Sequence, residues 1–162
     1  MANIVTIAYM CEVEKLYYIK GIDFIEKIAT GLKEHTFYIF GNTKEVTSIN
    51  SNVLFCGFLD HAELLNRMTE FDFYFQPSRS ESFGMAVLEA MHQGLTPIVS
   101  NKGALPEIVG DTGIVFDLSI QEALKALKNP VKTDILLLKE RTNKFSYDNR
   151  RKKIHAIINE LF

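Results

Sequence analysis

The 162-residue sequence is poor in cysteine, with only Cys11 and Cys56. Two cysteines are too few for a disulfide framework and have no metal-ligand spacing, which favours a reducing compartment and predicts a cytoplasmic protein. No apolar run approaches the roughly 20 residues that span a bilayer, and no secretory leader opens the chain. The net charge of −2 gives no general attraction to nucleic acid, and we interpret the basic run at residues 150–153 as a solvated helix face.

Several common catalytic fingerprints are also missing. The nine glycines include no G-x-G-x-x-G and no G-x-x-x-x-G-K-S/T, which disfavours dinucleotide-binding dehydrogenases and P-loop NTPases. No G-x-S-x-G marks the nucleophile of an α/β-hydrolase. The four histidines lack partners at ligand spacing, so we interpret each as a surface or helix-face residue: His35, His61, His92 and His155. We therefore expect neither a metal site nor a cofactor.

What the sequence does contain is an alternation of strand and helix patterns. Apolar segments rich in β-branched and aromatic residues lie at residues 3–10, 36–40, 52–58, 71–76, 96–100 and 113–117. Helical periodicity occurs between them. Strands that are apolar throughout are typical of a parallel sheet with helices on both faces. We predict one doubly wound, Rossmann-like α/β domain over residues 1–162, with about six strands and a helical C-terminal extension over about residues 120–162.

In open parallel sheets, ligands bind beyond the carboxyl ends of the strands. The candidate loops lie at residues 9–21, 41–43, 57–60, 77–84 and 101–106. In the stretch "QPSRSESFGMAVLEAMHQG", Pro77 ends a strand and Gly84 opens a helix, where the missing side chain lets a ligand approach the backbone. The N–H groups of residues 83–86, with the helix dipole behind them, suit phosphates or closely held hydroxyls.

Two glutamates belong to this stretch. Glu89 can accept hydrogen bonds from two vicinal hydroxyls, as acidic residues do with ribose in nucleotide sites. Periodicity alone leaves an exposed surface position for Glu89 equally open. If Glu81 and Glu89 shared one helix, eight residues would separate them by about 12 Å, beyond the roughly 5–9.5 Å of glycosidase pairs. The spacing therefore favours two clamps on an extended ligand, such as a nucleoside diphosphate sugar.

The same stretch, continued as "LTPIVSNKGALPEIVGDTGIVFD", resembles the donor-binding half of retaining glycosyltransferases of the GT-B fold. Glu81 and Glu89 match the E-x7-E motif of that family. The segments "KGIDFIEKIA", "FYIFGN" and "NVLFCGFLDHAELLNRM" extend the resemblance over about residues 3–117. The terminal helix is similar to the one that packs back across both domains of these enzymes. The resemblance implies that the chain is one half of a GT-B fold.

The resemblance also implies roles for single residues. Glu81 and Lys20 would be the catalytic residues: Glu81 would contact hydroxyls of the donor sugar and Lys20 would neutralise the diphosphate. Glu89 would hold the ribose diol. In these enzymes positive side chains and helix dipoles, rather than a metal, stabilise the leaving diphosphate. The predicted donor-binding residues are Lys20, Gly57, Phe58, Arg79, Glu81, Ser82, Phe83, Gly84, Met85 and Glu89, with Gly57 and Phe58 near the base.

One departure from the family pattern follows the first strand. Where the family shows glycine-arginine, this chain has Ala8 and Tyr9, and the loop that leads to Lys20 is lengthened. The arginine that would share the diphosphate is therefore not in place. We hypothesise that Arg79 partly substitutes for it, and the alternative of a solvated loop residue stays open.

A second departure is that GT-B enzymes have two such domains. We expect an N-terminal acceptor-binding domain in cis or in trans, and contact with the inner face of a membrane only through that half. The chain by itself is expected to bind a sugar nucleotide weakly and to transfer no hexose. The alternative function is a non-catalytic, nucleotide-sensing or partner-binding α/β domain, in which Glu89 faces solvent.

Overall fold

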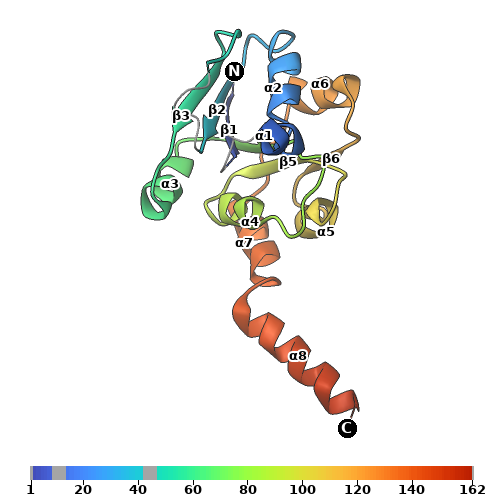
Figure 1. Ribbon diagram of the computed structural model, residues 1–162. Coiled ribbons are helices and arrows are strands. Elements are labelled where there is room, and N and C mark those ends of the chain that lie inside the picture. The colour runs from blue at the N-terminus through green and yellow to red at the C-terminus, as the bar shows by residue number, and fades with distance from the viewer. Residues whose placement is uncertain (1, 9–13, 42–46, 162) are drawn as a thin grey trace.

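A computed structural model describes residues 2–8, 14–41 and 47–161. Six parallel strands form one sheet in the order β3-β2-β1-β4-β5-β6 (Figure 1). The predicted doubly wound α/β fold is confirmed. The expectations for Tyr9, Cys11 and residues 42–43 lie outside the described residues. The strands are β1 (Asn3–Ile7), β2 (Thr36–Phe40), β3 (Val53–Gly57), β4 (Phe73–Gln76), β5 (Thr96–Ser100) and β6 (Ile114–Phe116).

Two groups of helices cover the sheet. On one face, α2 (Ile22–Ala29) and α6 (Ile120–Lys128) pack against buried strand residues such as Phe37 and Phe75. The opposite face of the sheet is covered by α3 (His61–Met68), α4 (Met85–His92), α5 (Leu105–Val109) and α7 (Ile135–Asn143). Because both faces are covered, strands such as β4 and β5 are buried along their whole length, which explains their continuous apolar sequence.

The topological switch point lies between β1 and β4. The chain passes from β1 outward to β2 and β3, returns to β4, and then moves to β5 and β6 on the other side. In open sheets of this kind, ligands bind beyond the carboxyl ends of the two strands at the switch point. Thr6 Oγ1 donates a hydrogen bond of 2.7 Å to the carbonyl oxygen of Phe75 between these strands. This hydrogen bond ties a side chain of one central strand to the backbone of the other.

Two helical segments differ from the sequence-based expectation. Residues 14–20 were expected in a loop, but Glu14–Lys20 form a helix, α1, that ends at Lys20. The expected C-terminal extension divides into two parts. The helices α6 and α7 pack on the domain through Ala123, Leu127 and Leu138.

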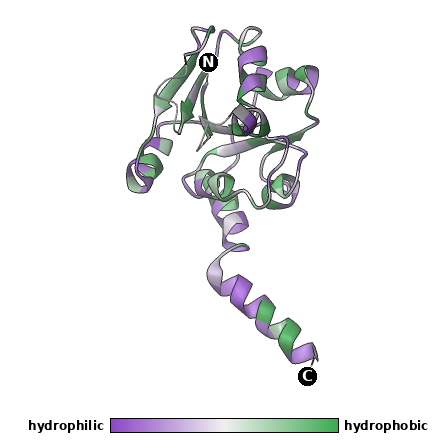
Figure 2. Cartoon of the chain, viewed as in Figure 1, coloured by the Kyte–Doolittle hydropathy of each residue, from purple (hydrophilic) through white to green (hydrophobic). Residues whose placement is uncertain are grey.

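Only the last helix, α8 (Tyr147–Leu161), projects away from the domain (Figure 1). Figure 2 shows hydrophobic bands on this helix near the C-terminus. Ile154, Ile157 and Ile158 of the helix are all exposed. They lie at i, i+3 and i+4, which places them on one face of the helix. No helix in the described part of the chain is long and apolar enough to cross a membrane.

The packing predicts how strongly the core depends on one aromatic ring. Phe75 is fully buried, with its ring centroid 6.2 Å from that of Phe37 and 5.6 Å from that of Phe116. We expect Phe75→Ala to lower the free energy of unfolding by roughly 3–5 kcal/mol, because it leaves a cavity among these rings. Leu136→Ala, at a side chain that is 72% exposed, should change it by no more than about 0.5 kcal/mol. If urea denaturation showed the same decrease in the free energy of unfolding for Phe75→Ala and Leu136→Ala, this account of the core would be wrong.

Candidate functional site

The site is built around an ion pair that crosses the switch point. Lys20 is the last residue of α1, which follows β1, and Glu81 lies in the loop after β4. Lys20 Nζ and Glu81 Oε2 are 2.8 Å apart, and the two side chains are 28% and 12% exposed. The structure therefore brings together the two residues for which the family resemblance implied a catalytic role. They are 61 positions apart in the sequence.

Glu81 has a second partner that sequence reasoning missed. Gln76 Nε2 donates to Glu81 Oε2 over 2.6 Å and to Ser78 Oγ over 3.1 Å. The hydroxyl of Tyr74 donates to Gln76 Oε1 over 2.9 Å. Because a carboxylate can only accept, this chain of bonds fixes the orientation of the glutamine amide. Burial, and then the charge of Glu81, raise the pKa of Tyr74 well above its usual range, so the phenol stays a neutral donor.

The loop after β5 supports the backbone of the loop that carries Glu81. Ser100 Oγ donates to the carbonyl oxygen of Ser78 over 2.6 Å, and the amide of Ala104 donates to the carbonyl oxygen of Glu81 over 3.1 Å. Gly103, at φ 59°, lies so close that an added Cβ would come within 2.0 Å of the same carbonyl oxygen of Glu81. Only glycine fits this approach, which explains why the loop needs one there.

Arg79 joins the end of α1 and the first turn of α2, where Asp23 lies, to the same loop. Its guanidinium donates to both carboxylate oxygens of Asp23, at 2.7 and 2.9 Å, and lies 3.7 Å above the centre of the Tyr18 ring. Its backbone amide donates to the carbonyl oxygen of Ile19 over 2.8 Å. The hypothesis that Arg79 contacts a diphosphate stays a prediction. The observed contacts give the side chain another role, which is to fix the end of α1, and with it Lys20, against the loop of Glu81.

Glu89 lies on α4, where its side chain is 25% exposed. Its Oε1 is 3.0 Å from Nε2 of His61, the first residue of α3. Since the carboxylate accepts, the proton lies on Nε2 of the imidazole. His61 is 66% exposed, as expected of a surface histidine, but the structure gives it a partner in the site.

The start of α3 also ties the loop of Gly57 and Phe58 to this region. The two residues lie three and four positions before His61 in the sequence. Asp60 and Glu63 form a capping box at the N-terminus of α3, which fixes where the helix begins. Phe58 itself is exposed. The structure thus places His61, at the end of the predicted base-binding loop, beside Glu89.

The N-terminus of α4 has no side-chain cap. Gly84 occupies the N-cap position at φ 93°, and no side chain bonds to it. Among the described residues, no hydrogen bond is formed by the backbone N–H groups of Phe83, Gly84, Met85 or Ala86. Ser82 is exposed beside them. Unpaired N–H groups with the helix dipole behind them can bind an anion or hydroxyls, and the binding of such a ligand here stays a prediction.

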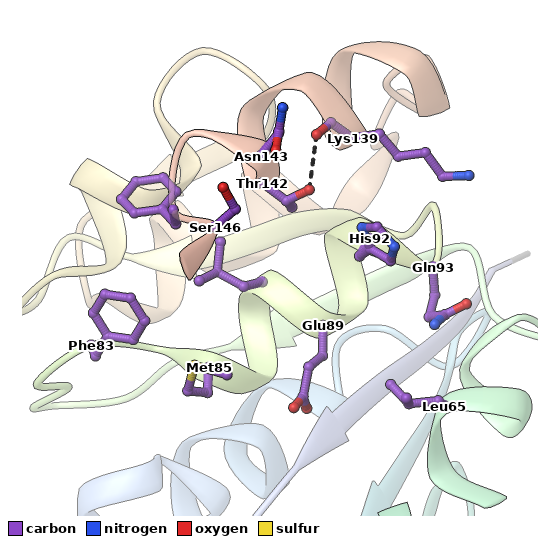
Figure 3. Close-up of a pocket in the computed structure, with 12 residues that line it drawn as sticks. Leu65, Phe83, Met85, Glu89, His92, Gln93, Lys139, Thr142, Asn143 and Ser146 are labelled. Atoms are coloured by element: carbon purple, nitrogen blue, oxygen red, sulfur yellow. Dashed lines mark hydrogen bonds between the residues drawn. The ribbon is translucent and has the colours of Figure 1, made fainter. Parts of the chain in front are cut away.

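A hollow of about 490 Å³ borders this region (Figure 3). It extends from Glu89 along α4 to α7, and Figure 3 shows Glu89 and Lys139 on opposite sides of α4. Its walls are mainly apolar and include the exposed side chains of Phe83 and Met85. The ring of Phe83 meets that of Phe145 edge to face, with 6.3 Å between the centroids.

The residues that sequence reasoning missed differ in the signal they left. Tyr74 and Gln76 are two positions apart in a strand, so period-two alternation places them on one face, and Gln76 is a polar residue at the carboxyl end of an apolar strand. That pattern could have identified Tyr74 and Gln76 from the sequence. Asp23 and His61 lie 56 and 28 positions from their partners, without any periodic relation. Among the described residues, no group of three or more histidine, cysteine or acidic side chains could hold a metal ion.

The contact between α1 and the loop of Glu81 can be tested at a glycine. Gly21, at φ 74°, packs so tightly that an added Cβ would come within 2.2 Å of the carbonyl oxygen of Pro77. Gly57 has nearly the same φ, 76°, but open space around its added Cβ. We expect Gly57→Ala to cost about 1–2 kcal/mol from backbone strain alone, and Gly21→Ala to cost about 1–3 kcal/mol more. Equal losses in the free energy of unfolding would show that Lys20 is not held by this contact.

Comparisons with known proteins identify the family of the chain. The family model for glycosyl transferases group 1 matches residues 9–152. The O-antigen biosynthesis glycosyltransferase WclY of Escherichia coli is 30% identical over 159 residues, which cover 88% of this chain and 44% of that protein. The glycogen synthase of Mycobacterium tuberculosis is 44% identical over 62 residues, covering 37% of this chain and 15% of that protein. The chain therefore spans less than half the length of these relatives.

Solved structures agree at the level of the fold. Sucrose-phosphate synthase from Thermosynechococcus elongatus superposes on 99% of this chain with a TM-score of 0.75 and 19% identity, and the match covers 46% of that protein. TarM superposes on 98% of this chain, again with a TM-score of 0.75 and with 17% identity, over 35% of its own length. The likeness confirms that the sheet and its helices are those of half a GT-B protein. Together with the family match, it shows that the chain belongs to the glycosyl transferases group 1 family.

Proposed function

We propose that this chain is the donor-binding part of a glycosyltransferase that moves a hexose from a nucleoside diphosphate sugar to an acceptor, with retention of configuration. The observation that carries the proposal is the convergence at the switch point of the Lys20–Glu81 pair and the uncapped N-terminus of α4. A cation, a carboxylate and unpaired N–H groups together are what a diphosphate joined to a sugar requires.

The diphosphate would lie between Lys20 and the N-terminus of α4. The ammonium group and the N–H groups of Phe83, Gly84 and Met85 would share its negative charge. When the bond from the sugar to the diphosphate breaks, the leaving group gains charge, so the same groups would stabilise the transition state more than the ground state. This arrangement would require no metal ion. Glu81, next to Lys20, would accept hydrogen bonds from hydroxyls of the sugar.

The nucleoside would extend from the diphosphate toward α3. Glu89 lies on the face of α4 that meets His61, and its carboxylate can bond the two ribose hydroxyls together. The base would then lie near Gly57 and the exposed residue Phe58. Ser82 lies in the same loop as Glu81 and would be beside the sugar.

The acceptor would be held by a second domain, in cis or in trans. The chain spans 44% of an O-antigen glycosyltransferase, so more than half of that relative has no counterpart here. We expect the second domain to cover the hollow beside Phe83 and Met85 and the exposed isoleucines of α8, and to provide any contact with the inner face of a membrane. The chain alone would bind the donor at the cytoplasmic side and transfer no sugar.

The role of Glu89 gives the direct test of donor binding. We expect one of UDP, GDP or ADP to raise the melting temperature of the chain, and Glu89→Ala to weaken its binding by about tenfold or more, because two charge-assisted hydrogen bonds to ribose are lost. The matched control is Glu122→Ala, at a glutamate on α6 whose side chain is 46% exposed, and it should leave the affinity unchanged. Isothermal titration measures both. If no nucleotide bound the chain, the proposed function would be wrong.

The role of Arg79 is tested by its partner. If Arg79 acts by docking α1, then Arg79→Ala and Asp23→Asn should each weaken nucleotide binding, by roughly three- to tenfold, and the double variant should be no worse than either one, because the two residues act as a unit. If Arg79 instead contacts the diphosphate, Asp23→Asn would release the guanidinium and tighten binding. The sign of the Asp23→Asn effect in titrations with the diphosphate decides between the two roles.

A further inference from the structure

A buried polar chain lies beneath Glu81. Tyr74 and Gln76 are both buried in the central strand β4, and neither is exposed to a ligand. Polar side chains in such a position cost free energy unless every donor and acceptor has a partner. Here the side chains form a chain of hydrogen bonds. The Tyr74 hydroxyl donates to Gln76 Oε1 over 2.9 Å, and Gln76 Nε2 donates to Glu81 Oε2 over 2.6 Å. The buried strand thus directs one N–H group at the carboxylate.

The two oxygens of Glu81 have different surroundings. Oε2 accepts from both Gln76 and Lys20, at 2.6 and 2.8 Å. Among residues 2–8, 14–41 and 47–161, no hydrogen bond reaches Oε1. One oxygen is therefore fixed by the protein, while the other keeps its capacity to accept from a ligand.

The two donors to Oε2 also differ. Lys20 is partly exposed at the end of α1, on a flexible side chain with an ammonium group that attracts any anion nearby. Gln76 is 2% exposed, and both ends of its amide are bonded. An anion that draws Lys20 away from Glu81 would leave Gln76 as the remaining anchor of the carboxylate.

We propose that Gln76, oriented by Tyr74, is a positioning residue that keeps the Glu81 carboxylate in place when Lys20 turns from it to the diphosphate of the donor, so that Oε1 stays directed at the sugar. This inference rests on the proposed function. It separates the recognition of the sugar from that of the nucleotide: Gln76 acts only through Glu81, and Glu81 contacts only the sugar.

The test compares a sugar nucleotide with the matching nucleoside diphosphate. The chain is titrated with UDP, GDP and ADP and with their glucose, galactose, mannose and N-acetylglucosamine conjugates, and the pair that the wild type binds most tightly is kept. Gln76→Met keeps the length of the side chain but donates no hydrogen bond. It should weaken the binding of the sugar nucleotide by about tenfold and that of the diphosphate by less than about twofold. Tyr74→Phe, which loosens Gln76 without removing it, should shift the same ratio by about two- to fivefold.

The matched control is Thr6→Val, which removes another buried hydrogen bond beside β4, to the carbonyl oxygen of Phe75. Among the described residues, the Thr6 side chain bonds neither Gln76 nor Glu81. This variant should leave the ratio of the two affinities unchanged even if the melting temperature falls. The inference is overturned by the following result in a wild type that binds a sugar nucleotide: Gln76→Met and Tyr74→Phe lower the affinities for the sugar nucleotide and for the diphosphate equally, or change neither affinity. If the wild type binds no member of the panel, the proposed function falls, and this inference with it.

Discussion

The carboxylate of Glu81 is the point on which the arrangement of the site depends. It is held from one side by Lys20, at the end of α1, and from below by Gln76, at the end of β4. Lys20 belongs to α1, which follows β1, and Gln76 to β4, and the order of the sheet reverses between β1 and β4. The ion pair and the hydrogen bond at Glu81 therefore join α1 to the end of β4 at the switch point, where ligands bind in sheets of this kind.

Around this centre the backbone leaves little freedom. Gly21 packs on Pro77 and Gly103 packs on the carbonyl oxygen of Glu81, both at distances that exclude a Cβ. The Arg79–Asp23 pair closes the same contact at the surface. Because three neighbouring segments meet without side chains between them, the position of the carboxylate is set by close backbone packing as well as by its hydrogen bonds.

The other end of the site is held more loosely. In the described part of the chain Glu89 pairs with one side chain, that of His61, which is largely exposed. Exposed pairs of this kind restrict a side chain weakly, because solvent competes for both members. The site therefore combines a rigid carboxylate where we place the sugar with an adaptable one where we place the ribose. Such a division is compatible with our proposal that a second domain holds the acceptor.

The sequence by itself determined the elements and the outline of the site. Continuous apolar strands between helical patterns predicted the six-stranded parallel sheet, and the rule that ligands bind at carboxyl strand ends, with the family resemblance, selected Lys20, Glu81 and Glu89. The tertiary structure alone decided that residues 14–20 are helical, that Arg79 lies on Asp23, and that His61 meets Glu89. The physical reason is that periodicity predicts only which face of its own helix or strand a residue occupies. The residue that a loop side chain contacts lies tens of positions away, and the two meet only when the packed sheet brings their segments together.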